Sequence, residues 1–291
     1  MRLQPKHYEI ELEDTTLGVH EWPGVGDPVL LLHATGFHSR CWDQIVQRLP
    51  EAHIFAADLR FHGTSGAGGE VDRVAMARDI DSLLDRLDLQ KVLGVGHSLG
   101  GYIVARVAAE NVDRFRELIL IDPVIPPLEQ ITPAADAVPL TAETHPVSRR
   151  KNRWRDSQEM VERFSAKPPF NRWQEAVLKD YCDYALVEVP GETFLQLACD
   201  PLHEAGVYVS GNGIAEIYPL LPRLKLPVTL LRAPPADDHQ LDLSGSPTNP
   251  ELVELLPQGR EIYLPELTHF IPMEDPDLVA RTIAEANASD N

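Results

Sequence analysis

The sequence predicts an α/β fold, with a mostly parallel twisted sheet that carries helices on both faces. Short apolar runs, which suit buried strands, alternate with stretches whose apolar residues recur at spacings of three and four, as in amphipathic helices. This alternation breaks off after residue 122 and resumes at residue 227. We therefore expect a core of residues 1–122 and 227–291, with a helical cap inserted over residues 123–226.

The individual elements follow from the same two patterns. An alternating outer strand is expected at residues 7–13, and a helix from Ser98 onward is marked by its apolar stripe. The other expected strands are residues 28–32, 53–58, 91–96, 117–121, 227–232 and 260–265, and the other expected helices are residues 42–49, 71–88, 249–256 and 275–287.

The composition excludes several classes of function. The 26 Lys and Arg residues against 45 Asp and Glu residues give a formal net charge of −19, which argues against nucleic acid and anionic membranes as partners. No apolar run approaches the roughly 18 residues of a membrane helix, and the first residues do not read as a secretory signal. Three widely spaced cysteines fit buried small hydrophobes in a reducing compartment, so a cytoplasmic location is expected: Cys41, Cys182 and Cys199.

The pentapeptide at residues 96–100, GHSLG, carries the chemistry. It matches G-x-S-x-G and falls between a predicted strand and a predicted helix, which is the context that this motif requires. Such a turn is too tight for Cβ atoms beside the serine, and it directs the helix N-terminus toward the site where negative charge develops. Ser98 is therefore the candidate nucleophile.

A serine hydroxyl needs a general base, and His269 is the candidate among 11 histidines. It lies in a loop after the last predicted strand, at the sheet edge where Ser98 is expected. Three further histidines, His33, His38 and His62, are placed on loops at this edge. They are expected to line the pocket, and a metal site built from them is a minor alternative, so that no metal is expected.

The base needs a carboxylate that fixes its tautomer. Asp237 and Asp238 follow the strand at 227–232 and precede His269, which gives the chain order Ser, Asp, His. Asp237 is the first choice and Asp238 the second, while Asp122 and Asp242 remain as alternatives.

Two backbone amides are needed for the oxyanion of the tetrahedral intermediate. One is expected from Leu99, the residue after the nucleophile, and the other from the turn after the strand at 28–32. In that turn Thr35 is preferred, with Ala34 and Gly36 as alternatives.

Four segments together, LLLHATGFHSRCW, DLRFHGTSG, GHSLGGYIV and LTHFIPMEDP, resemble the α/β-hydrolase fold family over residues 1–122 and 227–288. The resemblance implies that the turn after the third strand supplies the second oxyanion donor. Ala34 and Phe61 stand at positions where the family often has glycine. The related epoxide hydrolases and haloalkane dehalogenases use an aspartate nucleophile, so Ser98 favours the esterase and lipase branch.

The expected cap contains a basic stretch at residues 148–175, with 8 of the 26 basic residues and 4 acidic ones. The favoured interpretation is a solvated helix face. The alternative is that Arg149, Arg150 or Arg153 attracts a carboxylate-bearing substrate. Four interleaved aromatic residues are expected to pack the cap or to line an apolar acyl pocket: Trp154, Phe164, Phe170 and Trp173.

These observations predict a serine hydrolase that cleaves a carboxylic ester of a small or medium-sized molecule without metal or organic cofactor. A carbon–carbon bond hydrolase or a lactonase would use the same residues. A non-catalytic ligand-binding member of the fold is the alternative from another class. Assembly into a homo-oligomer is left open by the sequence.

Overall fold

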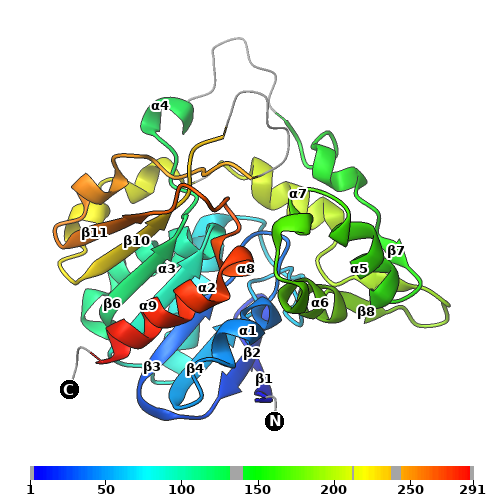
Figure 1. Cartoon of the computed structure of the whole chain (residues 1–291), viewed down its shortest axis with the longest axis horizontal. Helices are drawn as coiled ribbons and strands as arrows, with labels where there is room; N and C mark the ends of the chain where they lie inside the picture. Colours follow the sequence, from blue (N-terminus) through cyan, green and yellow to red (C-terminus); the bar gives the residue numbers. More distant parts are fainter. Residues whose placement is uncertain (1–2, 132–139, 212, 237–243, 289–291) are drawn as a thin grey trace.

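The structure, a computed structural model, describes residues 3–131, 140–211, 213–236 and 244–288. Its centre is an eight-stranded sheet in the order β1-β2-β4-β3-β5-β6-β10-β11 (Figure 1). Only β1 and β2 run antiparallel to their neighbours, and all other pairs are parallel. The strands are β1 (Lys6–Glu11), β2 (Thr16–Trp22), β3 (Val25–Leu32), β4 (Ala52–Ala57), β5 (Val92–His97), β6 (Phe115–Ile121), β10 (Val228–Arg232) and β11 (Gly259–Tyr263).

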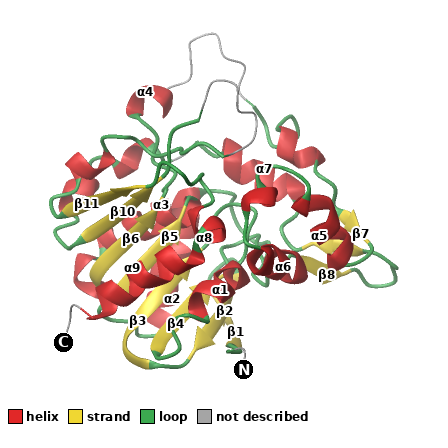
Figure 2. Ribbon diagram, viewed as in Figure 1, coloured by secondary structure: helices red, strands yellow, loops and turns green. Residues whose placement is uncertain are grey.

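Helices cover both faces of this sheet (Figure 2), as the sequence predicted. Successive strand residues point to opposite faces, so Leu30 and Leu32 pack in one core cluster while Val29 and Leu31 pack in another. The first cluster contains apolar residues of the helices α2 (Arg73–Arg86) and α3 (Leu99–Glu110). The second contains those of α1 (Asp43–Val46) and α9 (Pro276–Ala288). The mostly parallel α/β fold is thereby confirmed.

Outside residues 123–226, three elements differ from the sequence predictions. Strand β2 was not predicted, because its buried His20, whose ring is hydrogen-bonded to Ser39, interrupts the apolar pattern. The helix expected over residues 42–49 is a 3-10 turn, Ser39–Trp42, followed by the short α1. The helix expected over residues 249–256 is only the 3-10 turn Leu252–Leu255, and Pro257 prevents its continuation as a helix.

The segment between residues 123 and 226 contains helices and a small second sheet (Figure 1). Its α-helices are α4 (Leu128–Ile131), α5 (Ser157–Ser165), α6 (Glu175–Tyr184) and α7 (Pro201–Val209). Strands β7 (Arg153–Trp154), β9 (Leu195–Leu197) and β8 (Leu186–Glu188) pair antiparallel, and the sequence analysis did not predict them. Short 3-10 helices complete the segment: Pro146–Arg149, Phe170–Arg172, Ala215–Ile217 and Leu221–Arg223.

Residues between 123 and 226 share a hydrophobic cluster with loops that follow strands of the central sheet. Trp154, Met160 and Tyr181 pack there together with Phe37 and Phe270 of the core loops. The three cysteines are free and buried, as the sequence analysis expected of small hydrophobes. Within the described part of the chain, no helix is long and apolar enough to cross a membrane.

Candidate active site

Ser98 occupies the sharp turn between β5 and α3. Its backbone has φ +54° and ψ −113°, a combination that is strained for a residue with a side chain. A Cβ atom on Gly96 would overlap the carbonyl of Gly100, and one on Gly100 would overlap the carbonyl of Leu32. The close packing of α3 against β3 and β5 thus requires both glycines of the pentapeptide, and it raises Ser98 at the end of the sheet.

His269 reaches Ser98 from the loop between β11 and α8 (Ile271–Glu274). Its Nε2 atom lies 3.0 Å from Ser98 Oγ. Both backbone polar groups of His269 are engaged: its N–H donates to the carbonyl of Ser244 at 2.7 Å, and its carbonyl accepts from Nε2 of His97 at 2.8 Å. These two hydrogen bonds fix the backbone of His269 and thereby limit the positions that its imidazole can take. His97, the neighbour of the nucleophile, acts here as a positioning residue.

Asp122 lies directly after β6 and is fully buried. Its Oδ2 atom is 2.6 Å from Nδ1 of His269, so the hydrogen bonds run continuously from Asp122 through His269 to Ser98. The other carboxylate oxygen, Oδ1, accepts from the N–H of Ala233 at 3.1 Å and from the hydroxyl of Ser246 at 2.6 Å. These donors fix the carboxylate and compensate for its burial.

The sequence favoured Asp237, and after it Asp238, as the partner of His269, and the described geometry differs from this prediction. The position beside Nδ1 of His269 is held by Asp122, which the sequence analysis kept as an alternative. Asp237, Asp238 and Asp242 lie outside the described residues. Strands β6 and β10 are neighbours in the sheet, so an aspartate after either strand can reach the same histidine.

The two expected oxyanion donors come from two different segments of the chain. Leu99 is the first residue of α3, and Thr35 is in the turn after β3 and lines the same cavity as Ser98. The alternative donor Gly36 is excluded, because its N–H donates to Nε2 of His62 at 2.9 Å. The oxyanion roles of Leu99 and Thr35 remain predictions.

Two buried histidines support this turn. His33 accepts from the N–H of Leu59 at 3.0 Å through Nε2 and donates to the carbonyl of Ala34 at 2.8 Å through Nδ1. Burial lowers the pKa of His33 to about 3 and that of His62 to about 4, so both are neutral near pH 7. His38 likewise donates to the carbonyl of Tyr181. Among the described residues, no group of three or more His, Cys, Asp or Glu side chains could hold a metal ion.

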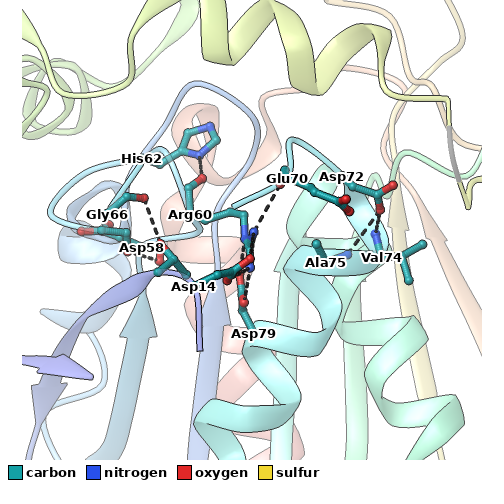
Figure 3. A network of polar contacts seen from close by, with 12 residues as sticks. Asp14, Asp58, Arg60, His62, Gly66, Glu70, Asp72, Val74, Ala75 and Asp79 are labelled. Carbon is teal, nitrogen blue, oxygen red and sulfur yellow. Dashed lines mark hydrogen bonds and ion pairs between the residues drawn. The ribbon is translucent and has the colours of Figure 1, made fainter. Parts of the chain in front are cut away.

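The loop that carries His62 is itself held by charged contacts (Figure 3). Nδ1 of His62 donates to the carbonyl of Arg60, and the guanidinium of Arg60 lies between Asp79 and Asp14. Phe61 has φ +70°, which explains why glycine is common at this position in the family that the sequence resembles. The strained loop therefore supports the turn that contains Thr35.

A cavity of about 760 Å³ opens in front of Ser98 and His269. Aromatic rings from the loops after the sheet strands and from residues 140–211 form part of its wall: Phe37, Trp154, Phe164, Phe170, Tyr181, Tyr208 and Phe270. Trp173 is not part of the wall but packs against Phe37 and Phe270, with ring centroids 5.5 and 5.4 Å apart. Three of the four aromatic residues that the sequence analysis singled out in the insertion thus line the cavity.

Cationic side chains of the basic stretch also line this cavity: Arg149, Arg150, Lys151, Arg163 and Lys167. Arg150 is ion-paired with the buried Glu204 and donates to the hydroxyl of Tyr181 at 3.0 Å. Arg153, the third arginine named from the sequence, instead stacks over the ring of Phe194 and does not line the cavity.

Residues 29–282 match a family model described as the alpha/beta hydrolase family. The lipase LipV of Mycobacterium tuberculosis is 35% identical over 97 residues, which are 33% of this chain and 37% of that protein. A putative non-heme haloperoxidase of Mycobacterium phage D29 is 31% identical over 122 residues, covering 40% and 43% of the two chains. The matched regions therefore span less than half the length of these curated relatives.

Solved structures resemble nearly the whole chain. An E-2-(acetamidomethylene)succinate hydrolase superimposes with a TM-score of 0.74 at 19% identity, covering 97% of this chain and 98% of its own. The thioesterase domain from the curacin biosynthetic pathway gives a TM-score of 0.73 at 17% identity, covering 97% and 99%. At these identities the similarity shows a shared fold.

Proposed function

The chain belongs to the alpha/beta hydrolase family, and we propose that it is a serine hydrolase that cleaves a carboxylic ester of a small or medium-sized substrate. The observation that carries the proposal is the hydrogen-bonded series Asp122, His269 and Ser98. Its last member, Ser98, lines a cavity large enough for a substrate.

The chemistry follows from the positions of the three side chains. Ser98 Oγ attacks the ester carbonyl while Nε2 of His269 takes its proton, and Asp122 stabilises the imidazolium. The backbone amides of Leu99 and Thr35 hold the oxyanion. His269 then gives the proton to the leaving alcohol, which leaves an acyl-enzyme. Water, activated by the same histidine, releases the acid and restores the Ser98 hydroxyl.

The cavity supports a substrate of this size. About 760 Å³ lies within the usual range of roughly 300–1,000 Å³ for small-molecule sites, and its aromatic wall suits an acyl chain. In this proposal residues 123–226 act as a cap, because side chains of this segment such as Trp154, Phe164 and Phe170 supply much of the wall.

Two measurements on the purified protein test the proposal. A fluorophosphonate probe should form a covalent adduct on Ser98, located by mass spectrometry of the peptide. A series of p-nitrophenyl esters should release p-nitrophenolate, and Ser98→Ala should abolish both signals. A protein that neither reacts with the probe nor hydrolyses any ester would be a ligand-binding member of the fold, and the proposal would be wrong.

A further inference from the structure

We propose that the substrate carries an anionic group, a carboxylate or a phosphate, at the end that lies in the open part of the cavity. The groups that attract it are Arg149, Arg163 and Lys167, which we call the mouth cations. This inference rests on the proposed function and adds a substrate class to it.

The mouth cations lie at the open end of the site. All three are exposed, whereas Ser98 and His269, which line the same cavity, are buried. Two separate stretches of chain supply them: Arg149 ends the 3-10 helix Pro146–Arg149, while Arg163 and Lys167 belong to α5 and the turn after it. A substrate that reaches Ser98 therefore passes positive charge contributed from two segments.

The charges of the mouth cations are not neutralised by carboxylates of the described chain and can therefore interact with a ligand. No ion pair joins any of them to a carboxylate among the described residues, whereas the two other cations of the wall are compensated. Arg150 is paired with Glu204, and Lys151 with Glu159. Among the described residues that line the cavity, Glu204 is the only acidic one. The three positive charges of the mouth cations therefore remain uncompensated.

The positive charge at the cavity contrasts with the negative charge of the chain as a whole. A formal net charge of −19 repels anions from most of the molecular surface, so an anionic substrate needs a positive route to the nucleophile. Apolar groups from the same stretch, Phe164, Pro168 and Phe170, line the cavity beside the mouth cations. Together they suit a molecule with an apolar body and an anionic end.

The anion can belong to either side of the scissile bond. On the acyl side it would be a carboxylate that ends the acyl chain. On the leaving-group side it would be a phosphate, as in a coenzyme A thioester. Three substrates with the same six-carbon acyl length separate these cases: p-nitrophenyl hexanoate, mono-p-nitrophenyl adipate and hexanoyl-coenzyme A. The first two differ only in a methyl group against a carboxylate.

The test compares two triple variants with the same change in net charge. The mouth variant is Arg149→Gln with Arg163→Gln and Lys167→Gln. The control variant is Arg86→Gln with Arg223→Gln and Lys225→Gln, three exposed cations that do not line the cavity. Each variant lowers the net charge by three, so their comparison removes the effect of overall charge.

We expect the mouth variant to lower kcat/KM about ten-fold for the adipate ester or for hexanoyl-coenzyme A, chiefly through KM, because exposed charges act weakly but add up. The hexanoate ester should change less than two-fold, and the control variant should leave all three substrates unchanged. Added salt should lower kcat/KM for the anionic substrate in the wild type and not in the mouth variant. The substrate that responds identifies the side that carries the anion.

A binding measurement separates failure of this inference from failure of the proposed function. Ser98→Ala protein, titrated calorimetrically with monomethyl adipate, methyl hexanoate and coenzyme A, requires no turnover. Preferential binding of monomethyl adipate or coenzyme A that disappears in the mouth variant supports the anion site even if no ester is hydrolysed. Efficient hydrolysis of all substrates with identical behaviour of the mouth and control variants would overturn the inference and leave the hydrolase proposal standing.

Discussion

Replacing Asp122 by Asn tests the candidate triad with the least structural disturbance. Asp122 has φ +45°, a conformation that Asn tolerates well, so the backbone after β6 should be preserved. The N–H of Ala233 donates to Oδ1 and cannot be reversed. The Asn oxygen must therefore occupy the Oδ1 position, because otherwise a buried N–H would lose its acceptor at a cost of about 1–3 kcal/mol. The new NH₂ group then faces Nδ1 of His269.

This orientation imposes the wrong tautomer on the base. Nδ1 of His269 must accept a hydrogen bond from the NH₂ group, so the proton of the neutral ring moves to Nε2. That atom, 3.0 Å from Ser98 Oγ, can then only donate and cannot take the serine proton. The corresponding change in serine proteases lowers kcat about 10⁴-fold, which is roughly 5.4 kcal/mol of transition-state stabilisation.

The assay is the release of p-nitrophenolate at saturating ester, together with thermal unfolding of each variant. We expect Asp122→Asn to lose about 10³- to 10⁴-fold in kcat with nearly unchanged unfolding, and Asp237→Asn and Asp238→Asn to retain turnover. If Asp237→Asn or Asp238→Asn abolished turnover while Asp122→Asn did not, the acid would lie in that loop and the reasoning would be refuted.

Three further outcomes are expected. Ser98→Ala should lose about 10⁴- to 10⁶-fold in kcat while urea unfolding is unchanged, and activity above a tenth of wild type would contradict a nucleophilic role. Gly36→Ala should destabilise more than Gly191→Ala, because both glycines have positive φ but only at Gly36 would the new Cβ overlap Glu204; equal losses in urea unfolding would refute this. The pKa values of His33 and His62 are lowered on folding, so as the pH falls the unfolded chain binds protons before the folded chain does. The free energy of unfolding should therefore have its full value above pH 6.5. It should then fall as the pH decreases from 6.5 to about 4, and equal urea midpoints at pH 7 and 5 would contradict the assignment.

The sheet and its flanking helices could be predicted because each buried strand is apolar on both faces. Val29 and Leu31 pack toward α1 and α9, while Leu30 and Leu32 pack toward α2 and α3. Such runs leave little ambiguity about burial. Strand β2 escaped prediction for the opposite reason, since its buried His20 is satisfied by a side-chain hydrogen bond that no local pattern shows.

The turn around Ser98 was equally accessible from the sequence. The glycines at 96 and 100 are needed for local close packing, and a local requirement leaves a local signature. His269 could be placed because it follows the last strand of the sheet, at the edge where Ser98 lies. Of the mouth cations, the sequence singled out Arg149, whereas Arg163 and Lys167 were visible only as part of an excess of basic residues. That all three line one cavity depends on how residues 140–211 pack.

The acid could not be chosen from the sequence, because the chain order Ser, Asp, His holds for Asp122 as well as for Asp237. The two positions are distinguished by the pairing of β6 with β10, in which the N–H of Asp122 donates to the carbonyl of Leu231 at 2.8 Å. This contact and the positive φ of Asp122 turn its carboxylate toward His269, while Ala233 and Ser246, which follow β10, supply donors to it. In the described geometry the segment after β10 therefore holds the acid that β6 provides. A substitution in that segment, Ser246→Ala, should accordingly lower kcat through the orientation of Asp122 without removing any group that touches the substrate.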